Sequence, residues 1–149
     1  MEKWTEKIQL YQNIVETTQI HGPISKLIGM KFVHVEKGKT KFELTPNENH
    51  YNRGGSVQGG VLCTMADASM GFAFGSTVDI DQEFTTIEMK INFIRPVFIN
   101  QTLLAIGKVV HRGKRTGVGE STIYFKKEFE LTGDAAKPVA KASCSLIIL

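Results

Sequence analysis

The alternation of hydrophobic and polar positions divides the chain into an initial helix, a long apolar helix and several strands. An amphipathic helix is predicted over residues 2–20, because apolar residues recur there at near-helical spacing (Trp4, Ile8, Tyr11 and Val15). The run His21-Gly22-Pro23 ends this helix. Residues 58–74 predict a second helix, closed by Gly75 and Ser76. Because this helix is apolar all round, we expect it to be buried on every side.

The other apolar segments alternate with a period of two, which is typical of strands. Two strands are predicted around Met30–Val35 and Phe42–Leu44, joined by a turn at residues 36–39. Four more follow the long helix, over residues 84–95, 101–111, 117–130 and 138–149. In the first of these four, Ile87, Met89, Ile91 and Phe93 alternate with polar residues, so we expect one covered and one solvated face. An antiparallel sheet curled around one central helix satisfies this order, which predicts an α+β fold.

Composition indicates one globular domain. The chain has 149 residues, of which 42% are hydrophobic and 22% charged, and these proportions argue against disorder. We therefore expect a single domain over residues 1–149, with residues 1–22 as an N-terminal helical extension. The net charge of +3 is too small to indicate nucleic acid as a partner, but it suits an anionic small ligand.

The two cysteines, Cys63 and Cys144, lie far apart in apolar segments. We expect both to be reduced and to behave as small hydrophobic residues. The charged start of the chain is not followed by an apolar segment, so we expect no secretory signal. No run of eighteen apolar residues occurs, so we expect no membrane span and a cytoplasmic location.

A glycine-rich turn at residues 52–60 opens the long helix, and Asp67 stands in the middle of that helix. The glycines leave backbone N–H groups free at the helix start, where partial positive charge collects. A buried carboxylate is costly unless it is paired or used. Together, free amides and a carboxylate supply an oxyanion pocket and a base or nucleophile, which are the requirements of acyl transfer.

The spacing of these residues resembles a known signature. Asn-x-x-Gly-x-x-His-Gly-Gly, followed by Asp nine residues after the His, is typical of hotdog-fold acyl-CoA thioesterases of the phenylacetic-acid-degradation type. Here the signature is carried by Asn52, Gly55, Gln58, Gly59, Gly60 and Asp67, and the strand ending in Arg95-Pro96 also resembles the family. The resemblance covers the chain from about residue 25 to its end. It implies a hotdog fold, with five or six strands around the long helix.

The resemblance also implies a role for each matching residue. The Gly59 N–H would hold the thioester carbonyl oxygen, Asn52 would orient the carbonyl or the water, and Asp67 would act as base or nucleophile. Thr86 matches the hydroxyl residue that holds the water. Gln58 replaces the usual His; it keeps a donor and an acceptor but does not change charge near neutral pH. Apart from the resemblance, Arg112, Lys114 and Arg115 surround a glycine turn, and their charges suit the phosphates of CoA. Gly60 in the signature and His50 beside it are further candidates for contact with CoA. No metal and no separate cofactor is implied, because CoA is part of the substrate.

Spacing predicts a site shared between subunits. Gly59 and Asp67 are eight residues apart, or about 12 Å along a helix axis and about 80° around it. One carbonyl cannot easily touch both in the same subunit. An antiparallel pair of these helices across a two-fold axis would bring Gly59 of one chain near Asp67 of the other. We therefore expect a homodimer. The sequence favours a further assembly as a dimer of dimers but leaves the choice between dimer and tetramer open. The resemblance implies acyl-CoA as the small-molecule partner.

Each residue also has a structural interpretation. The glycines would allow close packing, Asp67 would be a buried structural carboxylate, Asn52 a turn residue, Gln58 a helix cap, and the basic cluster a solvated turn. Met65, Met70, Phe72, Phe74 and Phe84 line either an acyl pocket or the core. Three functions follow: an acyl-CoA thioesterase as the main hypothesis, a non-catalytic acyl-CoA-binding protein, and an enoyl-CoA hydratase or dehydratase on the same fold. The sequence contains no nucleophile elbow, phosphate loop, dinucleotide fingerprint or metal-ligand spacing.

Overall fold

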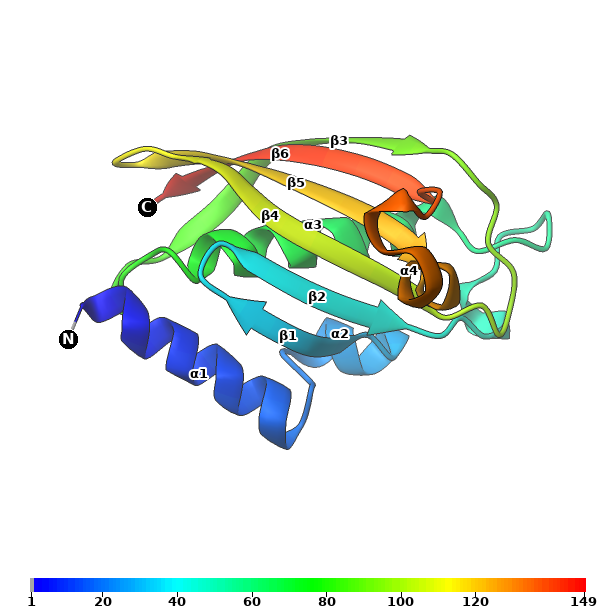
Figure 1. Ribbon diagram of the computed structural model, residues 1–149, viewed down its shortest axis with the longest axis horizontal. Coiled ribbons are helices and arrows are strands. Elements are labelled where there is room, and N and C mark those ends of the chain that lie inside the picture. The colour runs from blue at the N-terminus through cyan, green and yellow to red at the C-terminus, as the bar shows by residue number, and fades with distance from the viewer. Residues whose placement is uncertain (1) are drawn as a thin grey trace.

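A curved antiparallel sheet wraps around one long helix in the computed structural model, which describes residues 2–149 (Figure 1). Within these residues the sheet has six strands in the order β1-β2-β4-β5-β6-β3. The strands are β1 (Lys31–Glu36), β2 (Lys39–Leu44), β3 (Phe84–Phe93), β4 (Leu103–Arg112), β5 (Thr116–Phe125) and β6 (Ala140–Ile148). The helices are α1 (Lys3–Thr17), α2 (Pro23–Ile28), α3 (Gly59–Gly75) and α4 (Lys126–Thr132), with 3-10 turns at Glu48–His50 and Gly133–Ala135. The predicted α+β hotdog architecture is confirmed.

The core lies between α3 and the concave face of the sheet. Met65, Met70 and Phe74 of α3 are fully buried there, so these three belong to the core. Alternate residues of β6 complete it, as the sequence predicts (Ala140, Ala142, Cys144, Leu146 and Ile148). The expectation that α3 is buried on every side is wrong for a single chain. Gly60 and Asp67 are exposed, so one stripe of α3 faces away from its own sheet.

A buried polar contact fixes how closely α3 approaches the sheet. The Ser69 hydroxyl bonds that of Ser121 on β5 at 2.7 Å, and the Ser69 carbonyl accepts a bond from Thr40 Oγ1 at 2.7 Å. Gly107 of β4 lies directly beneath this carbonyl, where any side chain would clash with it. The close approach therefore depends on glycine at position 107. This contact fixes the distance between α3, which carries Asp67, and the strands beneath it.

Helix α1 packs against β1, with Ile8 and Tyr11 buried on its inner face. Tyr11 contacts Phe72 of α3 at a ring separation of 4.8 Å. At its start, Lys3 pairs with Asp81 at 2.6 Å. Within the extension predicted for residues 1–22, helix α1 therefore packs on the same core. Among residues 2–149, no helix has both the length and the apolar character needed to cross a membrane.

Three local features differ from the expectations. The strand predicted over residues 117–130 ends at Phe125, where the chain turns into α4. The short helix α2 (Pro23–Ile28) was not predicted, although Pro23 occupies a first-turn position that suits proline. A β-bulge between Thr86 and Glu88 interrupts the alternation of β3, so the two halves of this strand do not share one phase.

Candidate functional site

The loop before α3 is held at both ends by backbone hydrogen bonds. Tyr51 and Val57 form an antiparallel bridge, and the Val57 N–H donates to the Val97 carbonyl at 2.8 Å. Asn52 organises the turn between them: its Oδ1 accepts bonds from the N–H groups of Gly54 at 2.8 Å and Ser56 at 3.3 Å, and its Nδ2 donates to Ser56 Oγ. In this structure the Asn52 amide therefore serves the turn that delivers Gly59 to the start of α3.

The first amides of α3 are free. No hydrogen-bond acceptor for the N–H of Gly59 or of Gly60 occurs among residues 2–149. Gln58 holds the N-cap position, but its side chain makes no capping bond and is exposed. Since the N-terminus of a helix of this length carries partial positive charge, these amides are suited to hold an oxyanion. The Gln58 side chain lies beside them with both its donor and its acceptor available.

A cavity of about 520 Å³ opens beside Gly59. It lies between the start of α3 and the segment that follows β3, and is lined mainly by apolar side chains (Val57, Leu62, Phe93, Ile94, Pro96 and Val97) with Ser56, Gly59 and Arg95. The ring of Phe93 covers Gly59 so closely that a methyl group on the Gly59 Cα would lie 3.0 Å from Cζ of the ring. Glycine here lets the ring and a ligand approach the helix start together.

Asp67 and Thr86 are brought together within one chain. Thr86 Oγ1 donates to Asp67 Oδ1 at 2.8 Å, from the first half of β3 to the middle of α3. Uninterrupted alternation would place Thr86 on the face opposite Met89, but the bulge puts both residues on the α3 side. Ile87, at the bulge, is 57% exposed instead of covered. Asp67 is therefore an oriented carboxylate on the open stripe of α3, not the buried one that the sequence predicts.

Gly59 and Asp67 do not meet within one chain. They are separated by two turns of α3, which is about 12 Å along the axis. Phe93 at the end of β3 contacts Gly59, whereas Thr86 near its beginning contacts Asp67, so β3 runs antiparallel to α3 beside both groups. The free amides at the start of α3 and the carboxylate in its middle therefore lie at two separate places on the chain.

The basic cluster lies at the far end of α3 from Gly59 (Figure 1). Arg112, Lys114 and Arg115 form the tip of the β4–β5 hairpin, beside the last turn of α3. The Arg112 guanidinium lies 5.2 Å from the centre of the Phe74 ring and donates to the Gly113 carbonyl, so it packs on the protein. Lys114 and Arg115 are exposed and free to meet an anion.

His50 is part of the scaffold. It is 6% exposed, its Nδ1 accepts from the Asn47 N–H at 2.9 Å, and its Nε2 contacts the Ile28 carbonyl at 2.8 Å. Both ring nitrogens are therefore engaged, with Nε2 as the donor in the neutral ring. This arrangement leaves His50 no polar atom for CoA, in contrast to the contact expected from its position beside the signature.

The cysteines are not placed for nucleophilic chemistry. Burial raises the pKa of the Cys144 thiol to about 11, with the negative charges of Asp67 and Glu88 acting in the same direction. Burial also raises the pKa of Cys63. Both are free thiols, which remain protonated at neutral pH. Residues 2–149 contain no group of three or more His, Cys, Asp or Glu side chains that could hold a metal ion.

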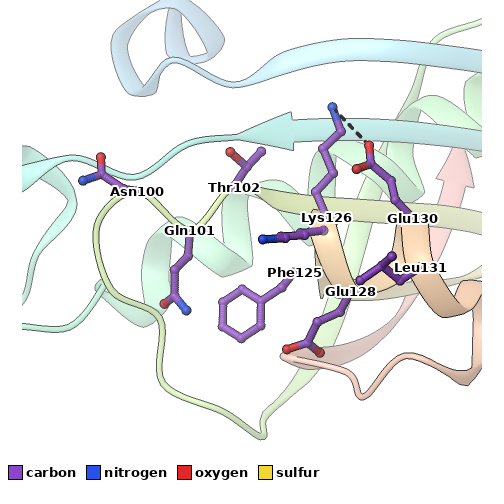
Figure 2. A pocket seen from close by; sticks show the side chains of 9 residues that line it. Asn100, Gln101, Thr102, Phe125, Lys126, Glu128, Glu130 and Leu131 are labelled. Atoms are coloured by element: carbon purple, nitrogen blue, oxygen red, sulfur yellow. Dashed lines mark ion pairs between the residues drawn. The ribbon is translucent and has the colours of Figure 1, made fainter.

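A larger cavity, of about 770 Å³, lies between α4 and the loop before β4 (Figure 2). Gly59, Asp67 and Thr86 do not line it. Phe125 and Glu128 point toward its interior, and Lys126 pairs with Glu130 at 3.7 Å on its rim. Sequence reasoning did not identify Phe93, Arg95 or Glu128 as functional candidates. Phe93 follows the strand pattern of its neighbours, and Glu128 lies in a segment predicted as strand. No sequence pattern therefore indicated that these residues line cavities.

Comparisons with known proteins identify relatives in sequence and in fold. A model of the thioesterase superfamily matches residues 54–128. SSO2140 of Saccharolobus solfataricus, whose name assigns it provisionally as an esterase, is 32% identical over 97 residues, which is 65% of this chain and 68% of that protein. The structure of the conserved protein PA5202 from Pseudomonas aeruginosa has a TM-score of 0.77 at 31% identity, and the match covers 89% of this chain and 98% of that one.

The acyl-coenzyme A thioesterase PaaI of Escherichia coli is also similar. It is 30% identical over 96 residues, which is 63% of this chain and 65% of that protein. Its structure, described as coming from the phenylacetic acid degradation operon, has a TM-score of 0.80 and covers 98% of this chain and 96% of that one. The sequence matches to these curated relatives span about two thirds of their length, whereas the structural matches extend over nearly the whole fold.

Proposed function

We propose that this chain, which belongs to the thioesterase superfamily, hydrolyses an acyl-CoA thioester to a free acid and CoA. The observation that carries the proposal is the pair of half-sites on α3. Free amides at Gly59 and Gly60 open onto a cavity, and Asp67 is held by Thr86 on the exposed stripe of the same helix. These are the donors and the carboxylate that acyl transfer to water requires.

A complete site needs two protomers in this proposal. Two α3 helices packed antiparallel along their exposed stripes would place Gly59 of one chain opposite Asp67 of the other, and would do so twice. Two features support this arrangement. The stripe carries Gly60 and Asp67 into solvent in the single chain, and β3 is an edge strand with Ile87 exposed. Exposed apolar edge strands are commonly covered by another strand.

The chemistry then follows from the charges. The thioester carbonyl oxygen accepts a bond from the Gly59 N–H, which stabilises the negative charge that develops on this oxygen; one such donor contributes about 3–4 kcal/mol. Asp67 of the partner subunit takes a proton from water as the water oxygen bonds to the carbonyl carbon, or its own oxygen makes that bond and gives an anhydride that water then opens. The carbon–sulfur bond breaks, and CoA leaves as a thiolate that accepts a proton.

Supporting roles follow from position. Thr86 orients the carboxylate, and Gln58 offers its amide beside the oxyanion donors. Asn52 acts through the turn that presents Gly59. In the antiparallel pair, the hairpin tip of one protomer lies near the α3 start of the other, so Lys114 and Arg115 would meet the CoA phosphates there.

The experiment is thioester hydrolysis followed by release of free thiol from a panel of acyl-CoAs. Asp67→Asn should lower kcat by about 100-fold or more, the usual contribution of an acid–base group, with the melting temperature retained. Asp134→Asn, which alters an exposed carboxylate in the turn Gly133–Ala135, is the matched control and should keep full activity. Unchanged turnover in Asp67→Asn would contradict the mechanism, and full turnover by a protomer that is monomeric in the ultracentrifuge would contradict the shared site.

Gln58 favours a second candidate, an acyl-CoA-binding protein without turnover. A glutamine side chain holds a carbonyl as well as a neutral histidine does, but it cannot supply or accept a proton near neutral pH. This candidate predicts a calorimetric binding signal for acyl-CoA with no thiol release at high protein concentration. The two measurements on one sample separate binding from catalysis.

A further inference from the structure

We propose that the cavity beside Gly59 receives an uncharged, apolar acyl chain, and that Arg95 in its wall, neutralised by Glu128, selects against acyl groups that end in a carboxylate. This inference rests on the proposed thioester hydrolysis and adds the substrate class. It also assigns a specificity role to a residue on α4, a helix that contributes nothing to the two half-sites.

Direction of binding follows from the lining of the cavity. The carbonyl held at Gly59 has an acyl group on one side and the pantetheine arm on the other. Pantetheine contains two amides that need hydrogen-bond partners when they leave water. The cavity walls are mostly apolar, and the Ser56 hydroxyl already accepts a bond from Asn52. An acyl chain needs no polar partner, so it is the group that these walls suit.

Arg95 is the charged residue in the wall, and Glu128 neutralises it. Its Nη1 donates to Glu128 Oε2 at 2.8 Å and its Nη2 to Oε1 at 2.9 Å, a two-pronged pairing. Nη1 also donates to the Lys137 carbonyl at 3.3 Å, and the guanidinium lies 4.6 Å from the centre of the Phe125 ring. The pairing raises the pKa of Arg95 and lowers that of Glu128, so both are charged at neutral pH.

A carboxylate at the end of an acyl chain would therefore find no free cation. Arg95 lines the cavity beside Gly59 and Glu128 lines the larger cavity, so the ion pair between them places a carboxylate directly behind the cation of the first lining. The chain end would lose water without gaining a partner, because the cation in the wall is already paired with a carboxylate, whose charge also repels a second one. A methyl end suffers neither cost.

Glu128→Gln tests this directly. Glutamine keeps the size of the side chain and an oxygen that can accept a bond from Arg95, but it removes the negative charge. Arg95 remains fixed by the Lys137 carbonyl and the Phe125 ring, so its positive charge becomes available in the cavity wall. Glu130→Gln is the matched control, because Glu130 lies on the same helix and pairs with Lys126 instead of Arg95.

The assay compares substrates of equal length: hexanoyl-CoA with adipoyl-CoA, and octanoyl-CoA with suberoyl-CoA. For the unaltered protein we expect kcat/KM to favour the methyl-ended substrate by at least roughly tenfold in each pair. Glu128→Gln should raise kcat/KM for adipoyl-CoA or suberoyl-CoA by about tenfold relative to the methyl-ended substrate of the same length. Glu130→Gln should change neither ratio. Melting temperatures show whether each variant is folded.

The outcomes separate this inference from the proposed function. Hydrolysis of both members of each pair with equal efficiency would overturn the inference and leave the thioesterase function in place; it would mean that pantetheine, not the acyl chain, occupies the cavity. Absence of thiol release from every acyl-CoA would instead overturn the proposed function. If Glu128→Gln is unstable, the ratio of the two kcat/KM values in the unaltered protein decides alone.

Discussion

Gly107→Ala should push α3 away from the sheet and destabilise the fold. A methyl group at this position would clash with the Ser69 carbonyl and lie 2.9 Å from the Met70 nitrogen, so helix or strand must move. Overpacking of this kind costs about 1–3 kcal/mol. The movement also weakens the Thr40–Ser69 and Ser69–Ser121 hydrogen bonds, at about 1 kcal/mol each. We therefore expect the free energy of unfolding to fall by about 4 kcal/mol.

Urea denaturation followed by far-UV circular dichroism measures this change, and the melting temperature should fall by about 10 °C. Gly22→Ala is the control, because a methyl group at Gly22 meets no atom within 4 Å. Asp67 lies two residues before Ser69, so the displaced helix should also misalign Asp67 with Thr86 and lower kcat more than it changes KM. A loss of stability below 1 kcal/mol would refute the view that Gly107 sets the distance between α3 and the sheet.

Two further predictions concern Thr86 and His21. Thr86→Val keeps the shape of the side chain and removes the hydrogen bond to Asp67, so kcat should fall by about tenfold while KM for acyl-CoA stays within twofold; Thr85→Val is the control, and equal effects of the two changes would contradict an orienting role for Thr86. His21 lies among the rings of Phe32, Phe42 and Phe72, and burial lowers its pKa from 6.5. As pH falls below 6.5, the unfolded chain binds a proton that the folded chain does not, so stability should fall toward the lowered pKa. His21→Phe should reduce the slope of the free energy of unfolding against pH, measured by urea titrations at pH 5 to 7.5. An identical slope would refute the assignment of this pH dependence to His21.

The strand pattern predicted the buried face of β6 correctly, but it assigned the residues before the bulge in β3 to the wrong faces of the sheet. In β6 every second residue is buried without interruption, so the sequence period equals the structural one. In β3 the bulge after Thr86 adds one residue, which reverses the phase of the second half. Because a bulge depends on pairing with β6, a pattern read along β3 alone cannot locate it. That is why the contact between Thr86 and Asp67 appeared only in three dimensions.

The exposure of Asp67 was also not predicted from the sequence. Apolar residues surround it along the chain, which predicts a buried carboxylate, yet small neighbours occupy its own stripe of α3 and leave it exposed. Similarly, apolar and polar residues continue to alternate past Phe125, so the sequence predicted a longer strand in place of the turn into α4. That turn is what brings Glu128 to Arg95, 33 residues away along the chain.

The sequence by itself determined the long helices, the six strands in an antiparallel sheet and the chemistry of the α3 start, because hydrophobic periods and glycine-rich turns act on neighbouring residues. It also determined that Gly59 and Asp67 stand two helical turns apart, since helix geometry is fixed locally. Tertiary structure decided which side chains meet: Thr86 with Asp67, Phe93 with Gly59, and Arg95 with Glu128. These contacts depend on strand register, a bulge and the docking of α4, which are set by packing between segments distant in the chain.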